Sequence, residues 1–211
     1  MGRPARTKAE REERMQAIRA AALDVFAAKG FAAARLDDVA QAAGVAKGTI
    51  YLYFKSKEDL LESIVKLKIG AVLEDVEQAI AASSAPASQM LRMVGKVLAE
   101  RIEDNDRRRV IHLVLSEGAR FPAIADYYHR EIISRGMALA RAIVAKGVAS
   151  GEFHSDELAH FPQLMIAPAL VATIWAIVFN RIEALDARAM IDAHFDLLLR
   201  ALTSPKLRSQ R

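Results

Sequence analysis

Apolar residues recur at intervals of three and four positions along the chain, which is the spacing of amphipathic helices. No alternating strand pattern and no internal repeat interrupts this spacing. Breaks at glycine, proline and clusters of Asn, Asp or Ser divide the pattern into about nine helices. They are predicted at residues 7–29, 36–43, 47–54, 56–82, 87–103, 107–118, 122–150, 156–181 and 187–202. The predicted fold class is therefore all-α.

The second and third predicted helices are short and are separated by Gly44. Glycine takes the left-handed backbone conformation without steric cost, so it is the usual residue after a helix end. Ile50 and Phe54 are four residues apart and predict the inner face of the third helix. Two short helices joined by a tight turn with glycine are typical of a helix-turn-helix motif, whose second helix enters the major groove of DNA. An ordinary helical hairpin is the alternative.

The outer face of the third predicted helix suits contact with DNA. Gly48 and Leu52 lie opposite the inner face, and Gly48 lets the backbone approach base edges. Thr49 offers a hydroxyl and a methyl group to the bases, and Lys47 at the helix start favours a phosphate or a guanine edge. The hydroxyls of Tyr51 and Tyr53 suit phosphate contacts, which position a protein without reading sequence.

The stretch from residue 30 to 61 resembles the DNA-binding domain of the TetR/AcrR family of bacterial transcriptional repressors. The resemblance is carried by Gly30-Phe31, Val39-Ala40, Ala43-Gly44-Val45, Lys47-Gly48-Thr49, Tyr51, Tyr53-Phe54, Lys57 and Leu60-Leu61. The family commonly has hydroxyl-bearing residues where Ala34, Arg35 and Ala46 stand, and Arg35 can replace one of their phosphate contacts by charge. The predicted DNA contacts are Arg35, Lys47, Gly48, Thr49, Tyr51, Leu52, Tyr53 and Lys57.

The positive charge is concentrated in the same part of the chain. Residues 1–57 hold eleven Lys or Arg against six Asp or Glu, whereas residues 58–211 hold nineteen against twenty. A phosphate-binding surface requires such an excess. The tail adds Gly2-Arg3-Pro4, similar to the core of a minor-groove AT-hook, although a solvated, disordered terminus is the alternative. The absence of cysteine fits a reducing compartment, and no signal peptide opens the chain, so we expect a cytoplasmic protein.

These observations predict two domains: a helix-turn-helix DNA-binding domain at residues 1–57 and an effector-binding and dimerisation domain at residues 58–211. Ser56 is the predicted N-cap of the helix that begins the second domain, with Asp59 in the capping-box position. That helix reaches about residue 82, roughly 40 Å at 1.5 Å per residue. It is therefore a candidate lever between the two domains.

Residues 161–180 carry no charge, which by length alone is compatible with a membrane span. Pro162, Pro168 and the many alanines weigh against that interpretation, since alanine inserts weakly. Pro162 is expected to start or kink the helix and Pro168 to bend it. A helix buried against a core and a second subunit would be equally apolar. The family resemblance implies that the last two helices form a homodimer interface, here at Leu164, Val171, Ile174, Phe195 and Leu198.

The sequence offers little support for catalysis. It contains no nucleophile elbow, phosphate loop or metalloprotease signature. His154, Asp156, Glu157 and His160 form the nearest approach to a metal cluster, but acidic residues at a helix start explain it without a metal. We therefore predict no enzyme activity, no catalytic residue, no metal and no cofactor.

Methionines and aromatic residues in the second half of the chain suit either a core or a pocket for an apolar or amphipathic molecule. The resemblance implies a small effector that releases DNA. The predicted pocket residues are Met90, His112, Glu117, Phe121, Tyr127, Tyr128, Met165 and Trp175. The predicted function is a homodimeric regulator of transcription, a repressor on a near-palindromic double-stranded operator. A DNA-binding regulator without an effector and a membrane-tethered regulator are the alternatives.

Overall fold

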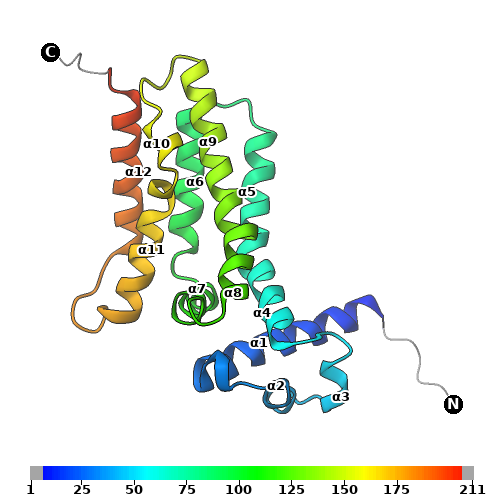
Figure 1. Ribbon diagram of the computed structural model, residues 1–211. Coiled ribbons are helices and arrows are strands. Elements are labelled where there is room, and N and C mark those ends of the chain that lie inside the picture. Colours follow the sequence, from blue (N-terminus) through cyan, green and yellow to red (C-terminus); the bar gives the residue numbers. More distant parts are fainter. Residues whose placement is uncertain (1–6, 206–211) are drawn as a thin grey trace. The chain divides into compact units, whose positions relative to one another are not determined.

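The computed structural model describes residues 7–205, and these residues form helices and loops without a strand (Figure 1). The all-α prediction is confirmed. The Gly2-Arg3-Pro4 motif lies outside the described residues. In chain order the elements are α1 (Lys8–Ala33), α2 (Leu36–Ala42), α3 (Lys47–Ile50), α4 (Lys57–Val65), the π-helical η1 (Lys66–Gly70), α5 (Ala71–Ala81), α6 (Ala87–Arg101), α7 (Asn105–Glu117), α8 (Pro122–Tyr128), the π-helical η2 (His129–Ile133), α9 (Ser134–Ala149), α10 (Glu157–His160), α11 (Gln163–Val178) and α12 (Ala187–Thr203).

Packing divides the chain into two compact units. The first unit contains the chain up to Lys68 together with Arg109–Tyr128, and the second contains Ile69–Arg108 together with the chain from His129 onward. The first unit therefore joins α1–α4 with α8 and the later part of α7. The functional boundary predicted at residue 57 concerns DNA and effector binding and stays a prediction.

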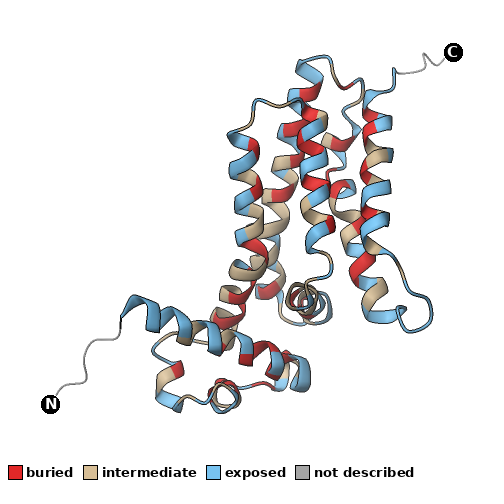
Figure 2. Cartoon of the chain, turned by 180° about the vertical axis from the view of Figure 1, so that it is seen from behind, coloured by how far each residue is buried: buried red, intermediate tan, exposed pale blue. Residues whose placement is uncertain are grey.

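The core of the first unit is formed by α1 packed on α2 and α4. Ile18, Phe26, Val39, Ile50 and Leu60 are among its buried side chains (Figure 2). The first helix starts at a complete capping box, in which Thr7 accepts a hydrogen bond from the Glu10 amide and donates its own amide to the Glu10 carboxylate. Its regular geometry is broken at Gly30, which has a φ of 73° in the left-handed region, and α1 continues to Ala33 beyond the predicted end at residue 29.

The predicted third helix is shorter than expected. Helix α3 covers Lys47–Ile50 rather than 47–54, and a tight turn follows. In that turn the amides of Leu52 and Tyr53 donate to carbonyls three residues earlier, at 3.2 and 3.0 Å. Such bonds belong to 3₁₀ geometry, which often tightens a helix end. β-branched and aromatic residues in this stretch are weaker helix formers, which favours the early end.

The helical run predicted at 56–82 is confirmed, with a π-helical segment inside it. It comprises α4, η1 and α5 without a gap from Lys57 to Ala81. The predicted N-cap at Ser56 is also confirmed, because its hydroxyl accepts a hydrogen bond from the Asp59 amide at 3.1 Å. Asp59 reaches back to the amide of Lys55, at 2.9 Å, rather than to that of Ser56.

In the second unit, α6 packs closely on α12 and α9, and α11 lies beside α12 (Figure 1). The core includes Met90, Leu91, Ile143, Met165 and Ile191. The single helix predicted at 122–150 is a run of α8, η2 and α9, with a second π segment at its centre.

The single helix predicted at 156–181 is wrong. Two helices stand there, α10 and α11, with a break at Phe161 and Pro162. Proline restricts the residue before it and has no amide to donate, so Pro162 ends one helix and precedes the next. Pro168, in contrast, is accommodated inside α11. Across residues 7–205, no helix combines the length and apolar character needed to cross a membrane.

Candidate nucleic-acid interface

The turn between α2 and α3 fixes the direction of α3. Gly44 has a φ of 64°, and the Val45 amide donates to the Ala40 carbonyl at 2.9 Å. Ile50 and Phe54 are both buried, at 0% and 3% relative exposure, which confirms the predicted inner face. The opposite face of α3 and its following turn is thereby directed to solvent. We call residues 47–53 the reader surface.

The reader surface exposes the side chains that the sequence singled out. Leu52 is 74% exposed and Tyr51 is 51% exposed, which is unusual for large apolar and aromatic residues. Gly48 is exposed, and a β-carbon built there would meet nothing within 4 Å. Thr49 and Tyr53 are half-buried. The backbone at Gly48 is therefore open to a close approach, with Tyr51 and Leu52 exposed beside it.

Lys47 has a partner that the sequence did not predict. Its ammonium lies 2.6 Å from the Oδ2 atom of Asp37 on α2, and this hydrogen bond raises the pKa of Lys47. The other oxygen of Asp37 is excluded from solvent and has no hydrogen-bond partner among the described residues. The cation at the start of the reader surface is consequently paired with a carboxylate.

Arg35 is exposed at the N-cap of α2. Its amide donates to Asp38 Oδ2 at 3.0 Å. Asp38 thus provides a capping hydrogen bond at the start of α2, where the family commonly has a hydroxyl-bearing residue. The Lys29 ammonium, 2.7 Å from Asp38 Oδ1, is the main cause that lowers the pKa of Asp38, and the Arg35 amide adds to it. Ala46, at the N-cap of α3, supplies no side-chain cap.

Lys57 makes internal bonds. Its ammonium donates to the backbone carbonyls of Phe31, Ala32 and Ala34 at 2.7, 3.0 and 3.3 Å. It also lies 4.7 Å from the centre of the Phe31 ring and 5.8 Å from that of Phe121. These contacts give Lys57 a structural role at the end of α1, and its phosphate contact stays a prediction.

Sequence reasoning missed Arg11. Its guanidinium lies 5.8 Å from the centre of the Tyr53 ring, which brings a cation from the first turns of α1 beside the reader surface. No ion pair of Arg11 is found within residues 7–205. Arg11 and Tyr53 are distant in sequence, and the polar face of α1 carries several other charges, so no local pattern distinguishes Arg11.

The residues predicted for an effector pocket do not come together in one cavity. Met90 and Met165 are buried in the core of the second unit. The indole of Trp175 donates to the Glu183 carbonyl at 2.8 Å. The other five belong to the first unit. His112 and Glu117 line a crevice of about 230 Å³ between α1 and α7, and Tyr127 lines a small crevice beside α4. Phe121 packs edge-on against Phe31, and Tyr128 ends α8.

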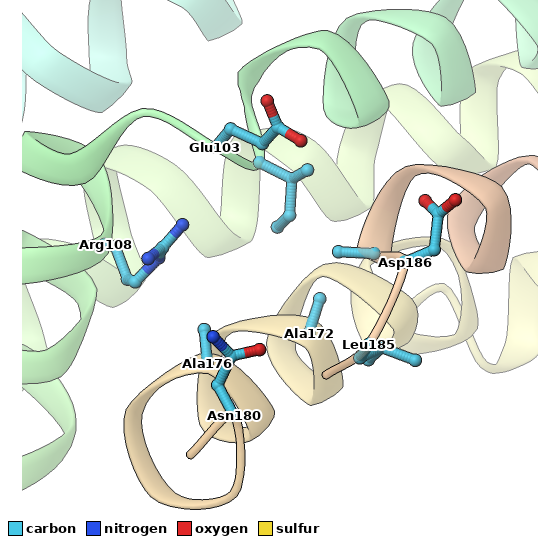
Figure 3. Close-up of a pocket in the computed structure, with 9 residues that line it drawn as sticks. Glu103, Arg108, Ala172, Ala176, Asn180, Leu185 and Asp186 are labelled. Atoms are coloured by element: carbon cyan, nitrogen blue, oxygen red, sulfur yellow. The ribbon is translucent and has the colours of Figure 1, made fainter. Parts of the chain in front are cut away.

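A larger crevice, of about 500 Å³, lies in the second unit where the turn from α6 to α7 meets the turn from α11 to α12. Figure 3 shows Arg108 from α7 and Asn180 from the turn after α11 directed into it, with Glu103 and Asp186 at its rim. Ala172 and Ala176 form part of an apolar wall. Its volume falls within the range of small-molecule sites, but with four polar or charged residues of nine its lining is more polar than is usual for them. None of the predicted pocket residues lines it.

Helix α11 presents an apolar surface. Leu164, Val171 and Ile174, three of the predicted dimer residues, are 40–47% exposed, and Val178 continues the same face. Leu198 is half-buried. Phe195, in contrast, belongs to the core, where its ring lies so close to Gly95 that an added β-carbon would stand 2.7 Å from it. Phe195 therefore has no exposed surface to offer a partner.

The possible metal ligands near residue 156 are spread out. The Nδ1 atom of His160 donates to the Asp156 carbonyl at 3.2 Å and lies 3.9 Å from the Asp156 carboxylate, with both side chains more than half exposed. No group of three His, Asp or Glu side chains placed to hold a metal ion is found in the part of the chain that the structure describes.

Comparison with known proteins agrees with this geometry. Residues 18–64 match the family model described as "Bacterial regulatory proteins, tetR family". The matched segment runs from the buried face of α1 to Ile64 in α4, so it includes the whole turn and the reader surface.

Relatives extend the similarity to nearly the full chain. The chain is 29% identical over 192 residues to the fatty acid metabolism regulator protein of Bacillus subtilis (strain 168), covering 91% of this chain and 96% of that protein. It is 26% identical over 202 residues to the transcriptional repressor KstR of Mycolicibacterium smegmatis, covering 95% of this chain and 94% of KstR. The crystal structure of the regulator FadR from Bacillus subtilis in complex with stearoyl-CoA superposes on this chain with a TM-score of 0.68 at 28% identity. The superposition covers 89% of this chain and 98% of the FadR chain.

These relatives are named as regulators or repressors of transcription, which are not enzymes. Their names agree with the helix-turn-helix geometry and with the prediction that the chain is not an enzyme. The chain belongs to the TetR family of DNA-binding transcriptional regulators.

Proposed function

We propose that this regulator is a homodimeric repressor in which each subunit places its reader surface in a major groove of a near-palindromic operator. The observation that carries this proposal is the exposure of Tyr51 and Leu52 on a turn anchored by buried Ile50 and Phe54. Twofold binding requires half-sites about 34 Å apart, one helical turn, or somewhat more.

The proposed DNA contacts are of two types, those to base edges and those to phosphates. Gly48, Thr49 and Lys47 are proposed to face base edges, because they lie on or beside the open side of α3. Arg35 and the tyrosine hydroxyls are proposed to bind phosphates. Arg11, which lies against the Tyr53 ring, joins them as a phosphate ligand from α1.

Selection of bound sites from random duplex DNA tests the proposal. A near-palindromic sequence should be recovered, and Lys47→Ala or Tyr51→Ala should weaken binding to it without lowering the thermal midpoint. Arg101→Ala is the matched control, since Arg101 is an exposed arginine at the end of α6 in the second unit, on neither α11 nor α12. Recovery of no preferred sequence, or equal affinity of the Lys47 and Tyr51 variants and the parent, would overturn the proposal.

The dimer is proposed to form through the apolar face of α11 together with the exposed side of α12. Exposed apolar residues that follow one another along a helix face mark an interaction surface. Val171 is 47% exposed on that face. Val171→Glu should therefore give monomers in sedimentation velocity, whereas Leu115→Glu, at a similarly exposed apolar position on α7, should leave the dimer intact. A dimer that survives Val171→Glu would place the interface elsewhere.

The effector is proposed to be a long-chain acyl-CoA. The support is the name of one relative, a fatty acid metabolism regulator, and the stearoyl-CoA bound by the FadR structure. The 500 Å³ crevice provides a polar entrance, with Arg108 available for a phosphate. Stearoyl-CoA should raise the thermal midpoint and lower operator affinity, and CoA and stearate alone should do so less.

A regulator without an effector is the competing proposal, and the filled core favours it. Met90, Leu91 and Met165 are 0–2% exposed, so a long acyl chain would have to displace packed side chains. If stearoyl-CoA changes neither the thermal midpoint nor operator affinity, this alternative is preferred. A membrane-tethered regulator would need detergent to leave the pellet after cell lysis.

A further inference from the structure

The reader surface contains one ion pair whose partners come from the two different helices of the helix-turn-helix motif. Lys47 at the start of α3 is 69% exposed at its side chain and is paired with Asp37, in the first turn of α2, at 2.6 Å. The pair is local to the first unit. A lysine at a DNA surface would gain more from phosphates if no carboxylate stood beside it, so the presence of Asp37 requires an account.

We infer that Asp37 is a specificity-determining residue, which offsets the charge of Lys47 and thereby weakens binding to DNA that is not the operator. This inference rests on the proposed function, since it assumes that the reader surface meets duplex DNA. It assigns to Asp37 a task that neither the sequence pattern nor the resemblance suggested.

Binding to random duplex depends almost entirely on phosphate neutralisation and the release of counterions. Each lysine or arginine that neutralises a phosphate steepens the dependence of log affinity on log salt by about 0.9. A Lys47–Asp37 pair carries no net charge. The pair therefore contributes little to binding at a random sequence.

At the operator, Lys47 can leave Asp37 for a base contact that a random sequence does not offer. A correctly placed guanine offers Lys47 two acceptors, N7 and O6, which a phosphate contact at random sites does not provide. The exposed lysine side chain is long enough to turn from Asp37 toward such acceptors. Because specificity is a difference between two affinities, weakening the competitor raises it as effectively as strengthening the operator contact.

Neighbouring cations are arranged differently. The carboxylate beside Lys29, that of Asp38, also accepts the Arg35 amide, so that pair has a structural task at the start of α2. No ion pair of Arg35 or Lys55 is found within residues 7–205, and both side chains are exposed. We therefore expect Arg35 and Lys55 to bind phosphates. Asp37 offsets only the charge of Lys47, the cation proposed to lie nearest the bases.

The test compares Asp37→Asn with the parent on the selected operator and on a scrambled duplex of equal length, by fluorescence anisotropy over a range of salt. Affinity for the scrambled duplex should rise about threefold to fivefold per subunit, as expected for an exposed ion pair. Its salt slope should steepen by about 0.9 per subunit. Operator affinity should rise less, so the ratio of the two affinities should fall.

Asp24→Asn is the matched control. It removes one negative charge from the same unit and breaks the 2.7 Å ion pair with Arg109, without touching the reader surface. It should leave the affinity ratio unchanged. In a Lys47→Ala background, Asp37→Asn should have no effect on the scrambled duplex. Should Asp37→Asn lower the thermal midpoint, Asp37→Ser, which keeps a polar group at the helix start, must change the ratio in the same direction.

Three results would overturn the inference while leaving the proposed function standing. The first is an equal change on both duplexes. The second is a loss of operator affinity with unchanged binding to scrambled DNA, which would mean that Asp37 orients Lys47. The third is an effect that persists without Lys47. A parent protein that prefers no duplex would instead contradict the proposed function itself.

Discussion

At the scale of single residues, Lys57 shows how a cation beside a DNA surface is used for folding. Its ammonium meets three carbonyls at the end of α1, where the helix leaves backbone acceptors unpaired. A positive charge is also favoured there by the helix dipole. The rings of Phe31 and Phe121 lie within 6 Å of the ammonium and add attraction from their π faces. One side chain thus holds together the loop before α2, the start of α4 and the residue that precedes α8.

Lys57→Met should lower the free energy of unfolding by about 2 kcal/mol, since hydrogen bonds from charged groups contribute about 1.5–3 kcal/mol and methionine keeps much of the aliphatic packing. Urea denaturation followed by circular dichroism measures the change. Lys55→Met is the control, because Lys55 is exposed and no side-chain bond of it is found among the described residues. Unchanged stability together with weaker operator binding would make Lys57 a phosphate ligand instead.

At the scale of elements, the start of α6 depends on a residue far along the chain. Pro86 precedes the helix and has no side-chain cap to offer, and the Glu152 carboxylate accepts the amides of Ala87 and Ser88 at 2.7 and 3.0 Å. Burial alone would raise the pKa of Glu152, but the hydrogen bonds from Ser88 and Ala87 outweigh it and lower the pKa. The loop after α9 is thereby fixed to the first turn of α6.

Glu152→Gln should reduce the free energy of unfolding by about 1 kcal/mol at pH 7, the usual contribution of an N-cap. Because the folded pKa is lowered, this stabilisation is complete above the unfolded pKa of about 4.3 and is lost as the pH falls through the folded value. Urea denaturation of both proteins from pH 7 to pH 3 should show the difference shrinking at the acid end. A difference that stays constant to pH 3 would mean that charge plays no part in the cap.

Element boundaries show which features the sequence could predict. Local signals at Gly44 and Ser56 mark the end of α2 and the start of α4, and Gly30 marks a break inside α1. The break at Phe161 and the short α3 were not predicted, although Pro162 and the aromatic stretch from Tyr51 carried the signal. The two π segments have no sequence signature comparable to a glycine or a proline.

The site could be predicted only where local spacing determines it. Ile50 and Phe54 are buried because helical periodicity directs them inward, and Tyr51 and Leu52 are exposed for the same reason. The pairing of Lys47 with Asp37, the internal bonds of Lys57 and the burial of Phe195 depend on how separate helices pack. The predicted effector residues are spread over the cores and crevices of both units, because methionines and aromatics fill cores as readily as they line pockets.

At the scale of the whole molecule, charge and apolar surface are distributed by task. The excess of Lys and Arg is confined to residues 1–57, whereas the long apolar face lies on α11. In the proposed function, a duplex would therefore contact the first unit and a second subunit would contact α11 of the second unit. Control by a ligand then requires only that the ligand binds more tightly to the conformation with lower affinity for DNA.

The coupling between ligand and operator must be the same in both directions. If stearoyl-CoA lowers operator affinity by some factor, thermodynamic linkage requires the operator to lower stearoyl-CoA affinity by the same factor. Couplings between sites are typically about 5–150-fold, which is measurable in both directions. Operator affinity with saturating ligand is read by anisotropy, and ligand affinity with saturating operator by calorimetry. Unequal factors would show that the lipid acts outside the folded dimer, for example as micelles that sequester protein, and would remove the case for an acyl-CoA effector.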